Sequence, residues 1–240
     1  MIYASMEMKE SKMKEIRTLP ANTGLKMEPI APSIQDWAHF ISFQPQLYFR
    51  PQDLEELKSF LISIFQGAFK QKKPRVLGSL HSCSDICVSD AIIDVSDLPR
   101  TIEFNADYSK VTVSANWHFH DFLLALSEHG KSISATGGTD EQTLAGIIST
   151  NTAPATPHTT IYELLEWVEY ITVDEDHASI VEKRVFKTDH DFRAAIGSLG
   201  AIGVLTKVQF NLVDELYFET VQKMIKLNVV FGCCSNLPQL

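Results

Sequence analysis

The chain contains 240 residues, of which 45% are hydrophobic and 21% are charged, so it can form a substantial core in one large domain or two small ones. Its formal net charge of −9 repels phosphate backbones and anionic lipids, which argues against generic binding to nucleic acids or membrane surfaces. No apolar run approaches the about 20 residues that a transmembrane helix requires, so we expect no transmembrane segment.

The first 33 residues mix lysine, glutamate and methionine without a sustained period, and we expect them to form a loose tail. They lack the continuous apolar core of a secretory signal. A mitochondrial address stays open, although Glu7, Glu10 and Glu15 argue against it. The sequence therefore favours the cytoplasm as the compartment of this protein.

The first half of the folded region alternates strand and helix signals. Residues 46–49 read as a strand, and residues 53–66 have apolar side chains at helical spacing, with Gly67 placed to end the helix. Short strands are expected at 75–77, 91–98 and 101–104. This order indicates a small α+β unit.

The second half predicts a further set of strands and helices. Strands are expected at 110–115 and 167–174, and helices at 120–130, 139–150 and 189–197, before a glycine-punctuated turn leads into a long strand. The expected fold class is therefore α+β, with two lobes in one continuous body. We place the subdomains at about 34–98 and 99–213, and read 214–240 as a C-terminal remnant.

Three glycine-containing segments could hold a ligand. Gly78-Ser79-Leu80-His81-Ser82 follows a short strand, and Gly78 permits close backbone approach to a planar group. The glycine pair at 137–138 precedes an expected helix start, which is a common anion site. Residues 198–204 allow tight backbone packing. Each segment alone also suits an ordinary turn or a solvent-facing loop.

Taken together, these segments resemble a known family. In this order, with YFRPQDLEELKSFL, KVTVSA, TDEQTLAG and SLGAIGVLTKVQF around them, they resemble the PCMH-type FAD-binding domain of the vanillyl-alcohol oxidase superfamily. The sugar-lactone and alditol oxidases, such as gulonolactone and D-arabinono-1,4-lactone oxidases, are the most similar branch. The resemblance covers roughly residues 37–213. It implies a two-subdomain α+β fold with FAD extended between the subdomains.

The resemblance also implies roles for particular residues. His81 matches a histidine that in this branch is often bonded to a methyl group of the flavin ring, because a neutral imidazole nitrogen can attack that carbon. Such a bond would make the flavin a stronger oxidant. The implied cofactor-binding residues are Gly78, Ser79, Leu80, His81 and Ser82 on one wall, Gly138, Thr139, Leu144, Ala145, Gly146 and Ser149 on the other, and Gly200, Gly203 and Val204 near the adenine half or the flavin edge.

One segment departs from the family pattern. Where the family has Gly-Thr-His-Gly, this chain reads NTAPATPH at residues 151–158, so Asn151 replaces a glycine, Ala153 the histidine and Pro154 the next glycine. Asparagine tolerates the left-handed region that a glycine would occupy. Proline removes a backbone donor, and losing one that faces FAD would weaken binding by about 1–3 kcal/mol. We do not expect His158 to replace the absent histidine.

The implied activity is oxidation of a hydroxyl-bearing carbon by hydride transfer to FAD, on a small lactone, polyol or similar alcohol. Relatives carry a further C-terminal domain that covers the flavin, and we expect the short C-terminus of this chain to reflect truncation. No catalytic base can therefore be named. Two alternatives stay open: a catalytically impaired remnant that acts as a binding module, and a subunit whose partner chain supplies the substrate domain.

Neither the cysteines nor the histidines indicate a metal site. Cys83 and Cys87 are three residues apart and Cys233 and Cys234 are adjacent, which does not match usual zinc spacings, so we expect reduced thiols. In WHFHD, residues 117–121, two histidines at i and i+2 have no completing ligand nearby. They suit a surface or helix-entry position. Residues 174–177, DEDH, are expected to form a hairpin turn.

Overall fold

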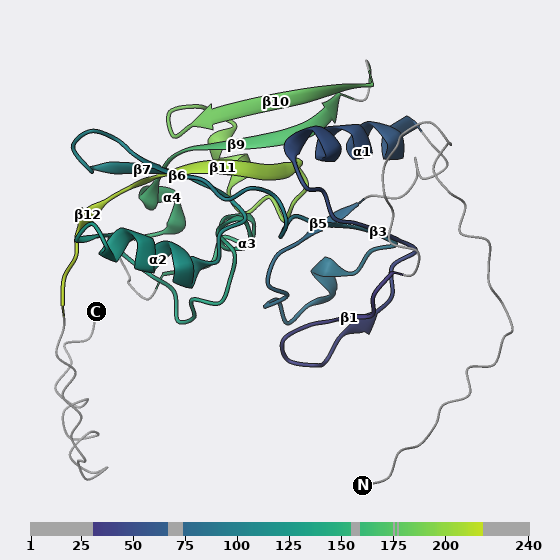
Figure 1. The fold of residues 1–240 in the computed structure, drawn as a ribbon, viewed down its shortest axis with the longest axis horizontal. Helices are drawn as coiled ribbons and strands as arrows, with labels where there is room; N and C mark the ends of the chain where they lie inside the picture. Colours follow the sequence, from purple (N-terminus) through teal and green to yellow (C-terminus); the bar gives the residue numbers. More distant parts are fainter. Residues whose placement is uncertain (1–30, 67–73, 155–158, 175, 177, 218–240) are drawn as a thin grey trace, which may run out of the picture.

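The computed structural model describes residues 31–66, 74–154, 159–174, 176 and 178–217, which form two lobes side by side (Figure 1). The first lobe contains a parallel three-stranded sheet in the order β3-β5-β4, covered by one long helix. Its elements are β1 (Ile34–Gln35), β2 (Ser42–Phe43), β3 (Leu47–Phe49), α1 (Leu54–Gln66), β4 (Arg75–Leu77), the 3-10 helix η1 (Asp85–Cys87) and β5 (Ala91–Asp94).

The second lobe is built on an antiparallel five-stranded sheet in the order β10-β9-β11-β7-β6. Three short helices and the nine-residue α2 accompany it, and β8 pairs with β12 at one end. Its elements are β6 (Ile102–Phe104), β7 (Lys110–Ser114), α2 (Phe119–Ser127), β8 (Lys131–Ser132), α3 (Leu144–Ser149), α4 (Ile161–Leu164), β9 (Leu165–Asp174), β10 (Ser179–Phe186), α5 (Phe192–Ala195), β11 (Val204–Asn211) and β12 (Val213–Asp214).

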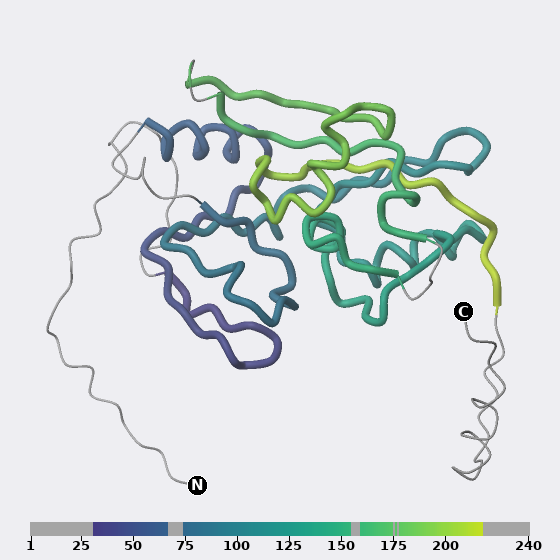
Figure 2. Tube along the Cα trace, turned by 180° about the vertical axis from the view of Figure 1, so that it is seen from behind, coloured from purple at the N-terminus to yellow at the C-terminus, as the bar shows by residue number. Residues whose placement is uncertain are grey.

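The two lobes share part of one core. Leu57 and Phe60 of α1 are fully buried, and they pack in one apolar cluster with Ile171 of β9 and Val204 of β11. On the surface, Lys58 of α1 reaches Glu182 of β10, with 2.7 Å between Nζ and Oε1. The view from behind shows α1 lying along the end of the larger sheet (Figure 2). The orientation of the lobes is therefore fixed by buried apolar contact as well as by the chain connection.

The expected α+β class is confirmed, and most expected elements are present with shifted ends. Two helices begin later than their patterns predicted. The helix expected at 139–150 begins only at Leu144, because Thr143 caps it and the preceding residues pair as loop backbone with the start of α2. The helix expected at 189–197 is only Phe192–Ala195. Strand β10 was not predicted, although the turn before it was. The subdomain boundaries stay predictions.

Among the described residues, no helix is both long and apolar enough to cross a membrane.

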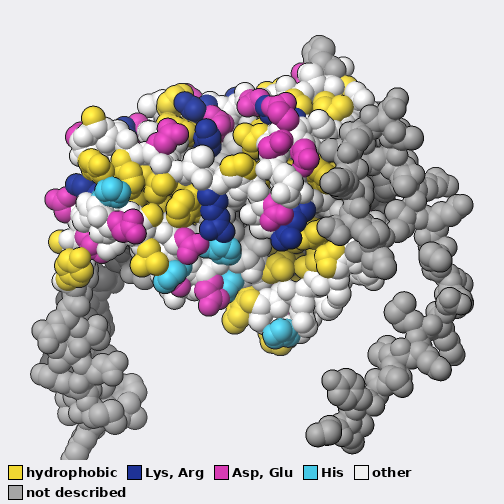
Figure 3. All heavy atoms as spheres, viewed as in Figure 1, with side chains coloured by type: hydrophobic (Ala, Val, Ile, Leu, Met, Phe, Trp, Pro, Cys, Tyr) yellow, Lys and Arg dark blue, Asp and Glu magenta, His cyan; other side chains and the backbone are white. Residues whose placement is uncertain are grey.

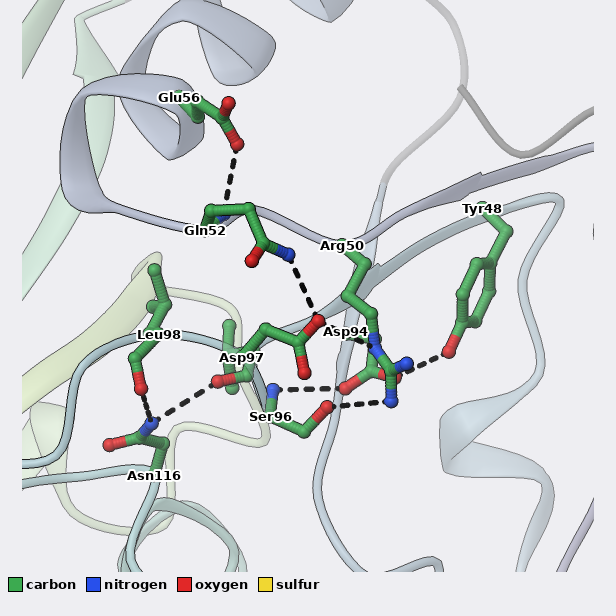
Figure 4. A network of polar contacts seen from close by, with 10 residues as sticks. Tyr48, Arg50, Gln52, Glu56, Asp94, Ser96, Asp97, Leu98 and Asn116 are labelled. Carbon is green, nitrogen blue, oxygen red and sulfur yellow. Dashed lines mark hydrogen bonds and ion pairs between the residues drawn. The ribbon is translucent and has the colours of Figure 1, made fainter. Parts of the chain in front are cut away.

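A polar network ties β3 to the end of β5 (Figure 4). The Asp94 carboxylate accepts hydrogen bonds from the Tyr48 hydroxyl, from Arg50 Nε at 3.1 Å and from the Ser96 backbone N–H at 3.0 Å. Burial by itself would raise the pKa of Asp94, but the hydrogen bonds from Tyr48 and Ser96 and the charge of Arg50 outweigh it, so the pKa is lowered. Burial and the bond to Asp94 raise the pKa of Tyr48.

We expect Asp94→Asn to lower the free energy of unfolding by about 2 kcal/mol at neutral pH, because the ionised carboxylate holds three donors and is only 13% exposed. The folded-state pKa lies below the ordinary value, so this contribution is present above the unfolded-state pKa and is lost as pH falls through the folded-state pKa. Urea unfolding over a pH series should therefore show the two proteins converging in acid. Exposed Glu103→Gln on β6 is the control, and a pH-independent difference would contradict the prediction.

Candidate functional site

A cavity of about 240 Å³ lies where the two lobes meet. The first lobe contributes β4, the loop after it and η1, and the second lobe contributes α3 and the turn before β11. The lining residues are Arg75, Val76, Leu77, Gly78, Ser79, Leu80, His81, Ser82, Ile86, Cys87, Gln142, Thr143, Ala145, Gly146, Ser149, Thr150, Leu199, Gly200, Gly203 and Leu205. Segments far apart in sequence thus form one site.

Most of the residues proposed from the sequence line this cavity. Ten do so: Gly78, Ser79, Leu80, His81, Ser82, Ala145, Gly146, Ser149, Gly200 and Gly203. The other four lie elsewhere. Gly138 and Thr139 are exposed and outside the lining, while Leu144 and Val204 have buried side chains that pack in the two cores. The side chains of Leu144 and Val204 point into the cores and so cannot contact a ligand in the cavity. These two residues instead anchor the cavity walls to the cores.

The loop from Gly78 to Ser82 presents free backbone donors. Leu80 has a φ of 57°, in the left-handed region, and its carbonyl accepts a hydrogen bond from the Trp37 N–H at 3.1 Å. Within the described part of the chain, the N–H groups of residues 79–82 donate no hydrogen bond. Buried or half-buried donors normally find a partner, so this loop can bind the oxygens of a ligand.

His81 is held by one contact from each lobe. Its Nε2 lies 3.0 Å from Oε2 of Glu141, and its ring stacks on Trp37 with centroids 5.4 Å apart and planes 10° from parallel. The His81 side chain is 16% exposed and that of Glu141 is 74% exposed, so the pair lies at the rim of the cavity. On the lower edge of the face in Figure 3, histidine side chains lie beside acidic ones. The orientation of the imidazole is therefore defined before any ligand enters.

The opposite wall approaches the loop very closely. A Cβ placed on Gly78 would lie 2.7 Å from Oγ1 of Thr143, and one placed on Gly146 would lie 3.1 Å from the same atom. That oxygen already accepts the Gly146 N–H at 3.2 Å as the cap of α3. Glycine at position 78 is thus required by space. The glycine pair at 137–138, by contrast, does not lead directly into a helix, so the helix start expected there is wrong, and anion binding at this pair stays a prediction.

The third wall is the turn before β11. Leu199, Gly200 and Gly203 have positive φ values of 53°, 77° and 133°. The Leu199 N–H donates to the Ser149 carbonyl at 2.9 Å, and the Leu199 carbonyl accepts from Arg75 Nη1 at 2.7 Å. Arg75 thus links β4 of the first lobe to this turn of the second lobe, and it also lines the cavity.

The altered segment at 151–158 behaves partly as expected. Asn151 has a φ of 50°, which confirms that asparagine takes the left-handed conformation here. Pro154 lines a separate pocket of about 10 Å³ beside Phe119 and Ile133, and is not part of the main cavity wall. The position at which proline lacks a backbone N–H is therefore not on the wall of the main cavity. The weaker FAD binding expected from Pro154 stays a prediction. Residues 155–158, including His158, lie outside the described residues.

The two histidines of WHFHD occupy the entry of α2, as expected. His118 is its N-cap, and Nδ1 of His118 donates to the Glu141 carbonyl at 3.1 Å. His120 pairs with Asp140, with 2.7 Å between Nδ1 and Oδ2, and this hydrogen bond lowers the pKa of Asp140. No cluster of possible metal ligands occurs among the described residues.

Sequence reasoning missed several residues of the site. Trp37 and Glu141 hold His81, Arg75 joins the lobes, and Gln142 and Thr143 belong to the second wall. Glu141 and its two neighbours stand inside the TDEQTLAG segment that was singled out, but a helix was expected there. Trp37 could be placed only once the β1–β2 hairpin was known to return beside the loop after β4.

Comparison with known proteins identifies the family. A family described as FAD binding domain matches residues 45–179. This chain therefore belongs to that family of FAD-binding domains, and its cofactor is FAD. Its fold is also similar to that of a solved "Solvent-stable cholesterol oxidase", with a TM-score of 0.67 and 15% identity over 82% of this chain and 39% of that one.

Among curated proteins, the chain is similar to sugar-lactone oxidases. It is 33% identical over 206 residues to D-arabinono-1,4-lactone oxidase of Kluyveromyces lactis, covering 82% of this chain and 38% of that protein. It is 28% identical over 189 residues to L-gulonolactone oxidase of Bos taurus, covering 77% of this chain and 41% of that protein. The chain thus spans about two fifths of the length of these relatives.

The residues of the cavity fit FAD in two respects. The free N–H groups of the loop at 79–82 match the phosphate and ring oxygens of that cofactor. Gln142 lines the cavity, and its Oε1 is buried without a hydrogen-bond partner in the described part of the chain, so it can accept from a hydroxyl or ring N–H. A cavity of about 240 Å³ encloses only part of FAD, and the remainder would lie along its open side.

Proposed function

We propose that this chain is the flavin-holding part of an FAD-linked oxidoreductase that oxidises a hydroxyl-bearing carbon of a small alcohol, such as a sugar lactone or polyol. The observation that carries the proposal is the cavity between the lobes, with free backbone donors and His81 on one wall and Gln142 on the other. Membership of the FAD-binding family and similarity to two kinds of sugar-lactone oxidase support the substrate class.

The residues of the chain would bind and orient the cofactor. FAD held by these residues would supply the acceptor for a hydride from the carbon that bears the hydroxyl group. The loop at 78–82 would bind oxygens through its N–H groups, and Gln142 would accept a hydrogen bond from the cofactor. Because Gly78 carries no side chain, its backbone can lie against Thr143 of the opposite wall, which holds the loop in place. The apolar side chains of Val76, Ile86 and Leu205 would exclude water from one side of that ring.

The chain offers His81 as a covalent anchor. The imidazole lies on the cavity wall with one nitrogen engaged by Glu141, which leaves the other free to act as a nucleophile. Attachment would keep FAD in place on an open cavity and raise its oxidising strength. The proposal includes a partner chain or further domain that covers the open side. It also keeps the cytoplasm as the compartment, which the free thiols of Cys83 and Cys87 support.

Reconstitution with FAD tests the proposed function. Purified protein is incubated with FAD, separated from free cofactor by gel filtration and examined for the visible absorption of flavin. D-arabinono-1,4-lactone, L-gulonolactone and a polyol are then added without oxygen. Bound flavin that bleaches with one of these compounds is the expected result. Bound flavin that bleaches with none of them would favour the binding-module alternative in a flavin-storing form. Protein that emerges colourless would contradict the proposed function and favour a flavin-less binding module.

Gly78→Ala should weaken FAD binding about tenfold, equivalent to about 1.4 kcal/mol, because the new methyl group lies 2.7 Å from the capping oxygen of Thr143. Rotating Thr143 away would lose the cap of α3, so the loop and wall must separate instead. Titration of FAD fluorescence measures the affinity. Gly138→Ala is the matched control, since no atom lies within 4 Å of its added Cβ. Equal FAD affinities of Gly78→Ala and Gly138→Ala would contradict the prediction that the close approach of Thr143 requires glycine at position 78.

A further inference from the structure

We propose that Glu141 is a positioning residue for flavin attachment, which holds the proton of His81 at Nε2 and makes Nδ1 the attacking nitrogen. The inference rests on the proposed function and concerns a residue of the second lobe acting on a residue of the first. It follows from the geometry of the pair, from the way both partners are fixed, and from the chemistry of imidazole.

The contact selects one tautomer of His81. Nε2 of His81 lies 3.0 Å from Oε2 of Glu141. An ionised carboxylate can only accept a hydrogen bond, so Nε2 must be the nitrogen that carries the proton. Nδ1 then keeps its lone pair, and it has no hydrogen-bond partner among the described residues. A neutral imidazole in the other tautomer would present an N–H at Nδ1 and could not attack from it.

Both partners are fixed by further contacts. The His81 ring stacks on Trp37, and the backbone N–H of Trp37 bonds the Leu80 carbonyl, so the ring plane and the loop are held together. Nδ1 of His118 donates to the Glu141 carbonyl at 3.1 Å, which anchors the backbone of the carboxylate. Neither group has to be ordered when the cofactor enters, and such pre-organisation is what a reacting pair requires.

The carboxylate has a chemical role in the bond-forming step. One C–H bond of the methyl group on the flavin ring would break first, with its proton leaving to solvent and its electron pair passing into the ring. His81 Nδ1 would then use its lone pair to form a bond to this methyl carbon, and positive charge would develop on the imidazole. Glu141 would stabilise that charge and accept the Nε2 proton. Dioxygen then takes up the two electrons and the two protons and becomes hydrogen peroxide.

The position of Glu141 at the rim limits the size of the effect and supplies a test. Its side chain is 74% exposed, so solvent screens its charge. We therefore expect Glu141→Gln and Glu141→Ala to slow attachment about tenfold. This effect is smaller than the factor of about 10² to 10⁴ that is typical of a general acid or base. The same exposure lets a small carboxylate reach the vacant position in Glu141→Ala. Added formate should restore the rate, with saturation, since it replaces the charge and the proton acceptor.

The experiment follows binding and attachment separately on the complete chain. Quenching of FAD fluorescence reports binding, and flavin that stays with the acid-precipitated protein reports attachment over time at saturating FAD. Asp140→Asn is the matched control. This carboxylate is adjacent in sequence but pairs with His120, so its removal should leave the attachment rate unchanged.

The outcomes separate this inference from the proposed function. Slow attachment in both Glu141 variants, rescue of Glu141→Ala by formate and a normal rate in Asp140→Asn would support it. A wild-type rate in Glu141→Gln, an equal loss in Asp140→Asn, or no rescue by formate would overturn it. Wild-type protein that binds FAD but releases all of it in acid would overturn the inference and the covalent anchor at His81, and leave the proposed FAD-linked oxidation standing. Wild-type protein that does not bind FAD would overturn the proposed function as well.

Discussion

Replacing His81 by alanine is expected to abolish acid-stable flavin completely, while the protein still folds and binds FAD reversibly. His81 lines the cavity at its rim and is not part of either apolar core, so its truncation leaves the packing of both lobes intact. The backbone donors at 79–82 do not depend on the side chain. We therefore expect the affinity for FAD to fall by no more than about tenfold, and attachment to disappear.

Cys87 carries the thiol of the cavity wall, and it provides the matched control. Burial raises the pKa of the Cys87 thiol, so little of the reactive thiolate is present near neutral pH. Cys87→Ser should therefore retain flavin through acid precipitation as well as the wild-type protein does. Mass spectrometry of the intact chain measures both variants. Flavin that remains on His81→Ala, or that disappears in Cys87→Ser, would show that the anchor has been assigned to the wrong residue.

Gly203→Ala is expected to lower the free energy of unfolding by about 3 kcal/mol or more. The glycine has a φ of 133°, and a Cβ there would lie 2.3 Å from the Ile171 carbonyl oxygen, which is backbone of β9 and cannot turn aside. The next residue, Val204, begins β11, which pairs with β9 and carries the shared core. The clash between the added Cβ and the Ile171 carbonyl would therefore disturb the junction of the two lobes, where β9 and β11 pack against α1.

Gly200→Ala separates the effect of conformation from that of contact. It has a φ of 77°, but its added Cβ meets no atom within 4 Å, so only the left-handed conformation costs free energy, about 1–2 kcal/mol. Urea unfolding of the three proteins gives the comparison. Equal losses for Gly200→Ala and Gly203→Ala would show that the close approach to Ile171 has no energetic consequence.

The sequence was sufficient for the fold class and for the loop that holds His81. Periodic apolar positions predicted α1 and the strands β9 and β11, because burial of one face imposes that spacing. The resemblance carried by the three glycine segments implied fourteen site residues, and ten of them line the cavity, in the loop after β4, in α3 and in the turn before β11. A glycine signal of this kind is local, because a positive φ or a close backbone contact restricts the residue type at that same position.

The other parts of the site depend on tertiary contact, which local patterns do not contain. Residues 139–143 read as helix because Asp140 suits a helix start and apolar residues follow. In the folded chain, the backbone of Asp140 and Gln142 instead accepts hydrogen bonds from the N–H groups of His120 and Phe119. The same pairing brings Glu141 to His81, sixty residues earlier in the chain. Leu144 and Val204 were placed in the site by resemblance, whereas their side chains turn into the cores.

Amide hydrogen exchange with and without FAD tests most directly whether this cavity is the cofactor site. Without FAD, the N–H groups of residues 79–82 have no hydrogen-bond partner in the described part of the chain and should exchange fast. Saturating FAD should slow them strongly, together with the 199–203 turn, and leave the exposed β6–β7 turn unchanged. Fast exchange at 79–82 in the presence of bound FAD, or protection confined to another surface, would contradict the account.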